Sequence, residues 1–343
     1  MAQMDGCGRQ VVVITGASSG VGRAVARAFG ARGALVAVLA RNEDALEACA
    51  EEIRAAGGEA LACPVDVSDA SAVERAAALV EGHWQRIDVW VNVAMVTVLA
   101  PVEDTTPDEY RRVTEVAYLG YVHGTLAALR RMRRQDSGTI VQVGSALAFR
   151  SIPLQSAYCA AKAAIRAFTD SLRTELLHDG SRVRVSQVHL PAVNTPQSVR
   201  QRNKMPHRQQ PVPPLFAPET IADAIVWAAR HAPRQMLVGL PTVRAIWGQA
   251  LIPGLLDRYL ATAGWEPQFV DAVNDQQRDI LFTTLPGDPG AHGPYRERER
   301  GPDLQLLARM HPTRTLIAGA SLVGLSMLGA LALARPWHPA RRR

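Results

Sequence analysis

The feature that most constrains the fold is a regular alternation between short β-branched runs and longer helical stretches, which continues from about residue 11 to residue 240. Short apolar runs bounded by turn residues predict buried strands, and strands that alternate with helices predict a parallel sheet covered on both faces. Strands are expected at VVVITG (11–16), ALVAVLA (34–40), EALACPVDV (59–67), IDVWVNVA (87–94), GTIVQVGS (138–145), RVRVSQVHL (182–190) and Met236–Gly239. Helices are expected up to about Gly30, then through Ala56, and over 69–83, 107–134, 155–178 and 218–231. The predicted fold class is therefore α/β, a doubly wound parallel sheet in a three-layer sandwich with a C-terminal helical extension.

The bulk composition agrees with such a fold and excludes some functions. A chain of 343 residues, 48% of them hydrophobic, is long enough for one large domain with additions. The formal net charge is +6, and much of the excess is arginine in the second half. No zinc-finger spacing or aromatic RNA-binding motif accompanies that charge, so a solvated surface explains it better than nucleic-acid binding.

The four cysteines give no sign of a metal site or a disulfide framework. They are scattered at positions 7, 49, 63 and 159, with no CxxC pair and no histidine cluster beside them. This usage fits a reducing compartment, and no metal is expected. The first ten residues are polar and do not resemble a signal peptide.

The glycine-rich stretch TGASSGVG (15–22) follows the first predicted strand and opens the first predicted helix. Gly16, Gly20 and Gly22 allow a tight turn and a close approach of the backbone to a ligand. The helix N-terminus then offers free N–H groups to a diphosphate. In its strand–turn–helix context the stretch predicts a Rossmann-like dinucleotide site.

The residue after the second strand bears on the choice of dinucleotide. A carboxylate there usually binds the ribose 2′-hydroxyl of NAD, whereas this chain has Arg41, which can pair with a 2′-phosphate. NADP(H) is therefore preferred over NAD(H), although an arginine that simply faces solvent is an alternative. Asp66 and Val67 are expected beside the adenine, and Asn92 and Ala94 beside the ribose.

Tyr158 and Lys162 are four residues apart on the helix predicted at 155–178, so their side chains share a face. An unperturbed tyrosine has a pKa of about 10, too high for a ready base at neutral pH. A nearby ammonium and an oxidised nicotinamide would favour the phenolate and lower that pKa. Cys159 points about 100° away on the helix and is expected to pack in the core.

These motifs together resemble the short-chain dehydrogenase/reductase family over residues 9–240. The likeness rests on TGASSGVG, Asp66–Val67, VNVA (91–94), Ser145, Tyr158 with Lys162, and PAVNT (191–195). It implies that Ser145, Tyr158 and Lys162 are catalytic: Ser145 holds the substrate oxygen, Tyr158 transfers a proton, and Lys162 lowers its pKa and binds the nicotinamide ribose. The cofactor-binding residues implied by the motifs and the resemblance are Gly16, Ser18, Ser19, Gly20, Val21, Gly22, Arg41, Asp66, Val67, Asn92, Ala94, Tyr158, Lys162, Pro191, Val193 and Thr195.

The sequence departs from the family pattern at two places. The usual Asn-Asn-Ala-Gly is Asn92-Val93-Ala94-Met95 here, and the usual catalytic asparagine of the following helix is Ala117. Since that asparagine ordinarily organises a water and the lysine for proton relay, either another group replaces it or catalysis is weakened. Thr114 and Tyr118 are candidates for the replacement.

The rest of the chain has weaker signals. The polar, proline-rich segment 196–216 is expected to be mobile, either as a lid over the site or as an ordinary surface loop. Residues 241–314 are interpreted as an extension and linker, with an apolar stretch at 246–265 and a Gly/Pro-rich, charged linker at 285–303. Residues 315–334 contain no charge and are long enough for a transmembrane helix, with a buried helix as the alternative, and 335–343 form a basic tail.

The predicted function is an NADP(H)-dependent oxidoreductase that transfers hydride between the nicotinamide and a carbonyl/hydroxyl substrate, which the apolar tail suggests is lipophilic. The alternative is a membrane-tethered dinucleotide-binding sensor or scaffold with weak or no catalysis. A homodimer or homotetramer is implied by the resemblance. The protein is expected to be membrane-associated and single-pass, with the catalytic domain facing the cytoplasm, or cytoplasmic if 315–334 is not a span.

Overall fold

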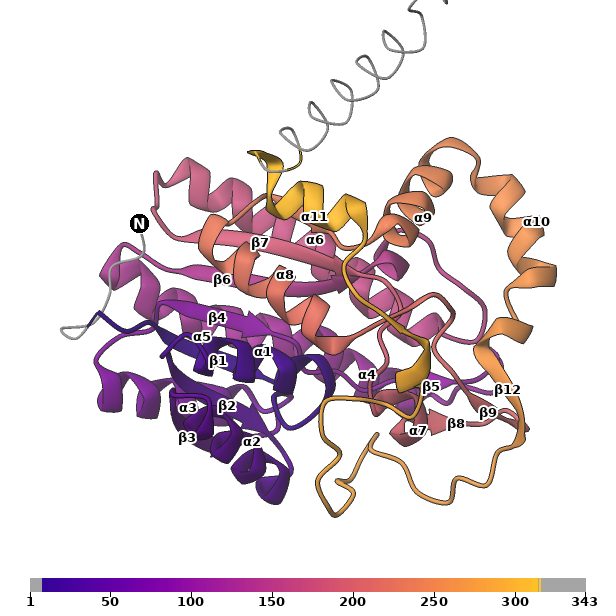
Figure 1. Cartoon of the computed structure of the whole chain (residues 1–343), viewed down its shortest axis with the longest axis horizontal. Helices are drawn as coiled ribbons and strands as arrows, with labels where there is room; N and C mark the ends of the chain where they lie inside the picture. Colours follow the sequence, from indigo (N-terminus) through magenta and orange to yellow (C-terminus); the bar gives the residue numbers. More distant parts are fainter. Residues whose placement is uncertain (1–7, 314, 316–343) are drawn as a thin grey trace, which may run out of the picture.

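A parallel sheet forms the centre of the molecule, as the alternation predicts (Figure 1). The computed structural model describes residues 8–313 and 315. Within these residues the main sheet has seven strands, all parallel, in the order β11-β7-β6-β4-β1-β2-β3. The strands are β1 (Val11–Thr15), β2 (Leu35–Ala40), β3 (Glu59–Pro64), β4 (Val89–Asn92), β6 (Thr139–Ser145), β7 (Arg184–Leu190) and β11 (Gln235–Leu237).

Helices cover both faces of this sheet, which confirms the three-layer prediction. One face packs against α1 (Gly20–Gly30), α2 (Glu43–Ala55) and α8 (Pro218–His231). The other packs against α3 (Ala70–Trp84), α5 (Gly120–Gln135) and α6 (Ser156–His178). Because both faces are buried, the central strands are apolar at nearly every position: all five residues of β1 and all six of β2 are buried.

The helix predicted at 107–134 is divided into three parts. It begins as α4 (Pro107–Thr114), which opens with a capping box in which Thr106 and Glu109 bind each other's backbone N–H groups. It passes through a π-helical turn at Glu115–Leu119 and continues as α5. Such π-turns often occur at functional sites, and this one contains Ala117.

The proline-rich segment at 196–216, which is expected to be mobile from its composition, contains short regular elements in the structure. It contains α7 (Gln197–Arg200), β8 (Arg202–Asn203), β9 (His207–Gln209) and β10 (Leu215–Phe216). β8 pairs with β5 (Val98–Leu99), β9 with β12 (Phe269–Val273) and β10 with β13 (Glu299–Arg300). Its ladder partners lie far away in the sequence, so no local pattern could reveal them.

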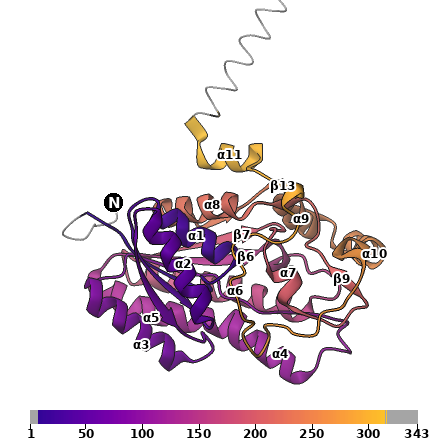
Figure 2. The same cartoon turned by 60° about the horizontal axis from the view of Figure 1, so that its bottom comes forward.

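The C-terminal extension packs on the domain along its length. It continues with α9 (Leu240–Leu251), α10 (Pro253–Ala263), β12 and β13, and ends in α11 (Leu304–Met310). Figures 1 and 2 show the orange segment between β12 and β13 running back from α10 toward α1 and α2. Leu281 and Ala291 of this segment are buried in the two cores of the domain, so the Gly/Pro-rich stretch predicted as a linker is packed against protein.

Within residues 8–313 and 315, no helix combines the length and the apolar character that crossing a membrane requires. The predicted span at 315–334 and the basic tail at 335–343 lie outside the described residues, except for Thr315.

Candidate active site

A cleft that is partly open to solvent lies at the C-terminal ends of the central strands. This is the edge where ligands bind in open α/β sheets. The cleft runs from the glycine-rich loop and the start of α1, past the ends of β2 and β4, to Tyr158 and Lys162 on α6. The predicted residues that line it are Gly16, Ser18, Ser19, Gly20, Val21, Gly22, Arg41, Asp66, Val67, Ala94, Tyr158, Lys162 and Thr195.

The glycine-rich loop packs so tightly that only glycine fits at two of its positions. Gly16 has a positive φ of 71°, and a Cβ there would lie 2.6 Å from the Cα of Ala94. A Cβ on Gly22 would lie 2.2 Å from the carbonyl oxygen of Gly16. The start of α1 therefore comes close to the end of β4, and its N-terminal N–H groups border the cleft. This cradle suits the diphosphate of a dinucleotide.

At the far end of the cleft, Arg41 is held by the C-terminal extension. Its Nη2 donates to the carbonyl of Ile280 at 2.6 Å, and its Nη1 donates to that of Phe282 at 3.2 Å. Burial lowers the pKa of Arg41, and the nearby charge of Arg112 adds to the effect. A partly buried cation beside a second arginine gains from a bound anion, so the site suits a phosphate.

Asp66, beside Arg41, forms an ion pair with Arg112 at 2.6 Å and accepts hydrogen bonds from the backbone N–H and the hydroxyl of Ser68. Burial raises the pKa of Asp66, but the hydrogen bonds from Arg112 and Ser68 outweigh it and hold that pKa below its usual value. Asp66 is therefore ionised at neutral pH, with its charge balanced by Arg112.

At the other end of the cleft, Tyr158 and Lys162 are lining residues, and Ser145, which is not among the lining residues, lies beside Tyr158. Ser145 ends β6, is 6% exposed and hydrogen-bonds the Tyr158 side chain. Lys162 is 2% exposed, and its Nζ lies 5.7 Å from the centroid of the Tyr158 ring. Tyr158 and Lys162 share one face of α6, as their spacing predicts.

The pKa values of this pair are not those that the sequence suggests. Burial raises the pKa of Tyr158 to about 12, although the hydrogen bond from Ser145 opposes the rise. Burial also lowers the pKa of Lys162 to about 7. In the protein alone, desolvation disfavours both charged forms, which opposes the expected effect of the ammonium on the phenol.

Lys162 is held by a residue that the sequence did not single out. Its Nζ donates to the hydroxyl of Tyr121 at 2.9 Å and to the carbonyl of Val143 at 2.8 Å, and it lies 4.7 Å from the Tyr121 ring centroid. Tyr121 is one helical turn after Ala117. The proposed replacements do not make this contact: the Thr114 hydroxyl donates to the Tyr110 carbonyl, and the Tyr118 ring packs edge-on against Phe168.

Three predicted cofactor residues do not line the cleft. Asn92 is fully buried, with its side chain bonded to Trp90, Thr125 and Gln142. Its side chain points to the sheet face covered by α5, because successive strand residues point to opposite faces. Pro191 and Val193 also lie away from the cleft, and Val193 forms a β-bridge with Phe216.

Sequence reasoning missed several residues that do line the cleft. From α7 and the extension these are Gln197, Arg200, Ile280, Thr284, Leu285 and Pro289. A basic, polar α7 beside PAVNT was a weak signal for the first two. No signal marked the others, since they follow no motif.

Cys159 is 3% exposed, as its prediction as a core residue requires. Among the residues described, no cluster of side chains could hold a metal.

Comparisons with known proteins agree with this geometry. Residues 10–206, more than half of the chain, match the family of short chain dehydrogenases. An uncharacterized oxidoreductase, YxnA, of Bacillus subtilis (strain 168) is 32% identical over 278 residues, which are 80% of this chain and 78% of that protein. A fatty acyl-CoA reductase of Acinetobacter baylyi is 28% identical over 78% of this chain and 89% of its own length.

A solved structure shows the same fold with a nucleotide. A metagenomic short-chain oxidoreductase crystallised in complex with NADP is 30% identical, with a TM-score of 0.58, over 68% of this chain and 97% of its own. The family match covers more than half of the chain, and one cleft contains both the glycine-rich cradle and the Tyr158–Lys162 pair. We conclude that the chain belongs to the short-chain dehydrogenase family of oxidoreductases.

Proposed function

We propose that the protein is an NADP(H)-dependent oxidoreductase that transfers hydride between the nicotinamide and a carbonyl/hydroxyl pair. The observation that carries the proposal is the single cleft that has a phosphate cradle at one end and Tyr158 with Lys162 at the other. The alternative of a non-catalytic sensor is not favoured, since Ser145, Tyr158 and Lys162 are all present and close together.

Each group along the cleft has a chemical task in this proposal. The N–H groups at the start of α1 bind the diphosphate, and Lys162 binds the nicotinamide ribose through its remaining N–H donor. A bound nicotinamide supplies or accepts the hydride. Ser145 Oγ holds the substrate oxygen, and Tyr158 Oη passes a proton to it or takes one from it.

The protonated state of Tyr158 suits the role of a proton donor. With a pKa of about 12 the hydroxyl is protonated at neutral pH, so it is ready to donate. A carbonyl that accepts hydride needs that proton to become an alcohol. The state of Tyr158 therefore supports carbonyl reduction, with the reduced cofactor as the hydride source.

The choice of cofactor and the class of substrate follow from the cleft lining. Arg41 supports NADPH over NADH because only the former has a 2′-phosphate to pair with it. Met95, Val96 and Leu190 line the cleft with Tyr158 and make that end apolar. Together with the similarity to a fatty acyl-CoA reductase, this supports a lipophilic carbonyl substrate. A homodimer or homotetramer, and membrane association through 315–334, stay predictions from the sequence.

The test is NADPH oxidation by the purified protein with a panel of aldehydes and ketones of increasing chain length. Tyr158→Phe is expected to lower kcat by a factor of about 10² or more, the range for loss of a general acid, and to leave NADPH binding intact. Tyr118→Phe is the matched control, because this tyrosine lies on the neighbouring π-turn and packs on Phe168. Unchanged turnover in Tyr158→Phe would refute the assigned proton donor, and NADPH binding without turnover of any carbonyl would favour the sensor.

A further inference from the structure

Residues 279–291, which we call the strap, border the cleft although they lie outside the part of the chain that matches the family. Ile280, Thr284, Leu285 and Pro289 of the strap line the cleft opposite the glycine-rich loop. In Figure 2 the strap crosses between α2 and α4. It therefore forms an outer wall over the end of the cleft where the adenosine phosphates are expected.

Carbonyl groups of the strap accept hydrogen bonds from donors of the nucleotide site. Arg41 donates to Ile280 and Phe282, and the backbone N–H of Gly20 donates to Gly290 at 3.0 Å. Two further donors, Asn42 Nδ2 at 2.8 Å and Arg200 Nη2 at 3.2 Å, share the carbonyl of Leu285. The strap thus contacts both the 2′-phosphate end and the diphosphate end of the site.

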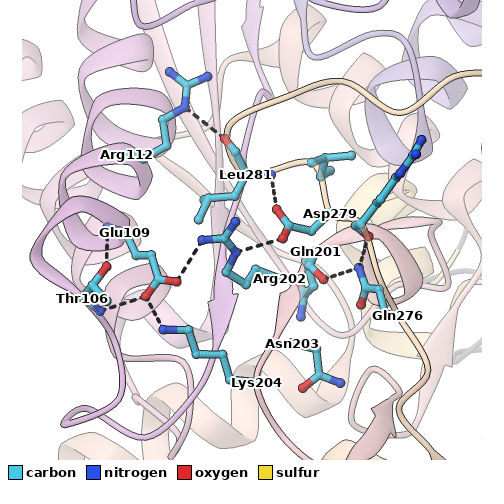
Figure 3. Close-up of polar contacts among 12 residues, drawn as sticks. Thr106, Glu109, Arg112, Gln201, Arg202, Asn203, Lys204, Gln276, Asp279 and Leu281 are labelled. Carbon is cyan, nitrogen blue, oxygen red and sulfur yellow. Dashed lines mark hydrogen bonds and ion pairs between the residues drawn. The ribbon is translucent and has the colours of Figure 1, made fainter.

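The first end of the strap is anchored by buried charge. Figure 3 shows Arg202 lying between Glu109 and Asp279, at 3.0 and 2.8 Å, while Arg112 donates to the carbonyl of Leu281 at 3.0 Å. Glu109 is only 3% exposed, and Leu281 is fully buried. These contacts fix the strap to α4 and to the segment after α7.

The second end is anchored to α1. Asp288 forms a bidentate ion pair with Arg23, with 2.9 Å between Nη2 and Oδ2, and Arg23 is 2% exposed. The same guanidinium also binds Glu52 of α2, at 3.1 and 3.0 Å. Both ends of the strap are therefore held, the first by α4 and Arg202 and the second by α1, and the residues between them line the cleft.

We propose that the strap is a part of the dinucleotide-binding site that covers the adenosine-phosphate half, so that NADP(H) binds and leaves faster when the strap opens. This inference rests on the proposed function. The strap makes exchange slow in both directions, and hydrogen bonding to its carbonyls keeps Arg41 and Arg200 oriented at the cleft. Loosening an anchor increases the rate of opening, and both the association and dissociation rates of the dinucleotide rise with it.

The test measures NADPH binding kinetics in the full-length protein by stopped-flow fluorescence, with association from mixing and dissociation from a chase with excess NADP. Asp288→Asn removes the negative charge that the strap places beside Arg23, and Arg23 keeps Glu52 as a partner. Both rate constants are expected to rise about tenfold. This factor corresponds to the lower end of the free-energy range for loss of one hydrogen bond to a charged group. Asp279→Asn tests the other end, where Arg202 keeps Glu109, and it serves as the test if Asp288→Asn does not fold.

Glu52→Gln is the matched control, because it removes the other partner of Arg23 without touching the strap. Glu52 and Asp288 share Arg23, and Glu52→Gln leaves Asp288 as the charged partner of Arg23, so neither rate is expected to rise more than about twofold above wild type. Wild-type rates in both strap variants would overturn the inference while leaving the proposed function intact. A rise in association alone, or an equal rise in Glu52→Gln, would also overturn it. Failure of the wild-type protein to bind NADPH or NADH would overturn the proposed function together with the inference.

Discussion

The buried amine of Lys162 should lower the stability of the fold at neutral pH. Its side chain is 2% exposed, and burial lowers its pKa from 10.5 to about 7. The unfolded chain therefore binds more protons than the native protein between about pH 7 and pH 10.5, so the free energy of unfolding rises with pH through this window. At 1.36 kcal/mol per unit, a shift of this size costs about 4 kcal/mol at pH 7.

Replacing Lys162 by methionine removes the charge and keeps most of the volume. The Tyr121 hydroxyl, which accepts from Lys162, also donates to the carbonyl of Val143 at 3.0 Å, so both groups keep a partner in the variant. The two lost hydrogen bonds offset about 2 kcal/mol of the gain. Lys162→Met is therefore expected to be more stable than wild type by about 2 kcal/mol at pH 7, while losing the ribose contact and with it activity.

Urea unfolding followed by tryptophan fluorescence, at one protein concentration, measures the effect at pH 7 and pH 9. Titration of other groups cancels in the difference between wild type and variant. As Lys162 in the wild type loses its proton, the stability difference should shift by about 2 kcal/mol toward the wild type between the two pH values. A difference that stays constant with pH would refute the claim that burial disfavours the charged form of the amine.

The remaining predictions concern the two ends of the cleft. In fluorescence titrations, Arg41→Ala should weaken NADPH binding by a factor of about 10 to 100, as expected for lost charged hydrogen bonds, and leave NADH binding unchanged. Equal weakening of NADPH and NADH binding would refute the pairing of Arg41 with the 2′-phosphate. Tyr121→Phe removes an acceptor that stabilises the Lys162 ammonium, so the pKa of Lys162 should fall further below 10.5. As a result, the alkaline limb of the kcat/KM profile should move to lower pH. Tyr118→Phe should leave this limb in place, and an identical profile in both variants would contradict the role of Tyr121.

The architecture could be predicted because its signals are local. Buried parallel strands require continuous apolar runs, and the strands at 34–40 and 138–145 end where β2 and β6 end. The helix at 218–231 has the predicted limits, since a proline opens it and the left-handed Ala232 ends it. A local rule also explains why Asn92, predicted beside the ribose, does not line the cleft. Side chains alternate along β4, and this alternation turns Asn92 into the core.

The strap could not be predicted because its interactions are made by backbone carbonyls across a large sequence separation. Arg41 and Ile280 are 239 residues apart, and no side-chain type at residue 280 is needed for the contact. A Gly/Pro-rich, charged segment has the same composition whether it is a solvated linker or an anchored strand of chain. Only the partners distinguish the two cases: the strap's Asp279 pairs with the partly buried Arg202, and its Asp288 pairs with the buried Arg23.

The structure also changes which residue tunes the proton donor. An amine with a pKa of about 7 loses its proton five units before a phenol with a pKa of about 12, so the amine is neutral over the range in which it was expected to assist the phenolate. Among the contacts of Tyr158, the hydrogen bond from Ser145 is the one that lowers its pKa. Ser145 therefore favours the developing phenolate directly. Lys162 already donates to Tyr121 and Val143, so it has a third N–H for the ribose only when it is protonated, and both this contact and its charge depend on what binds beside it.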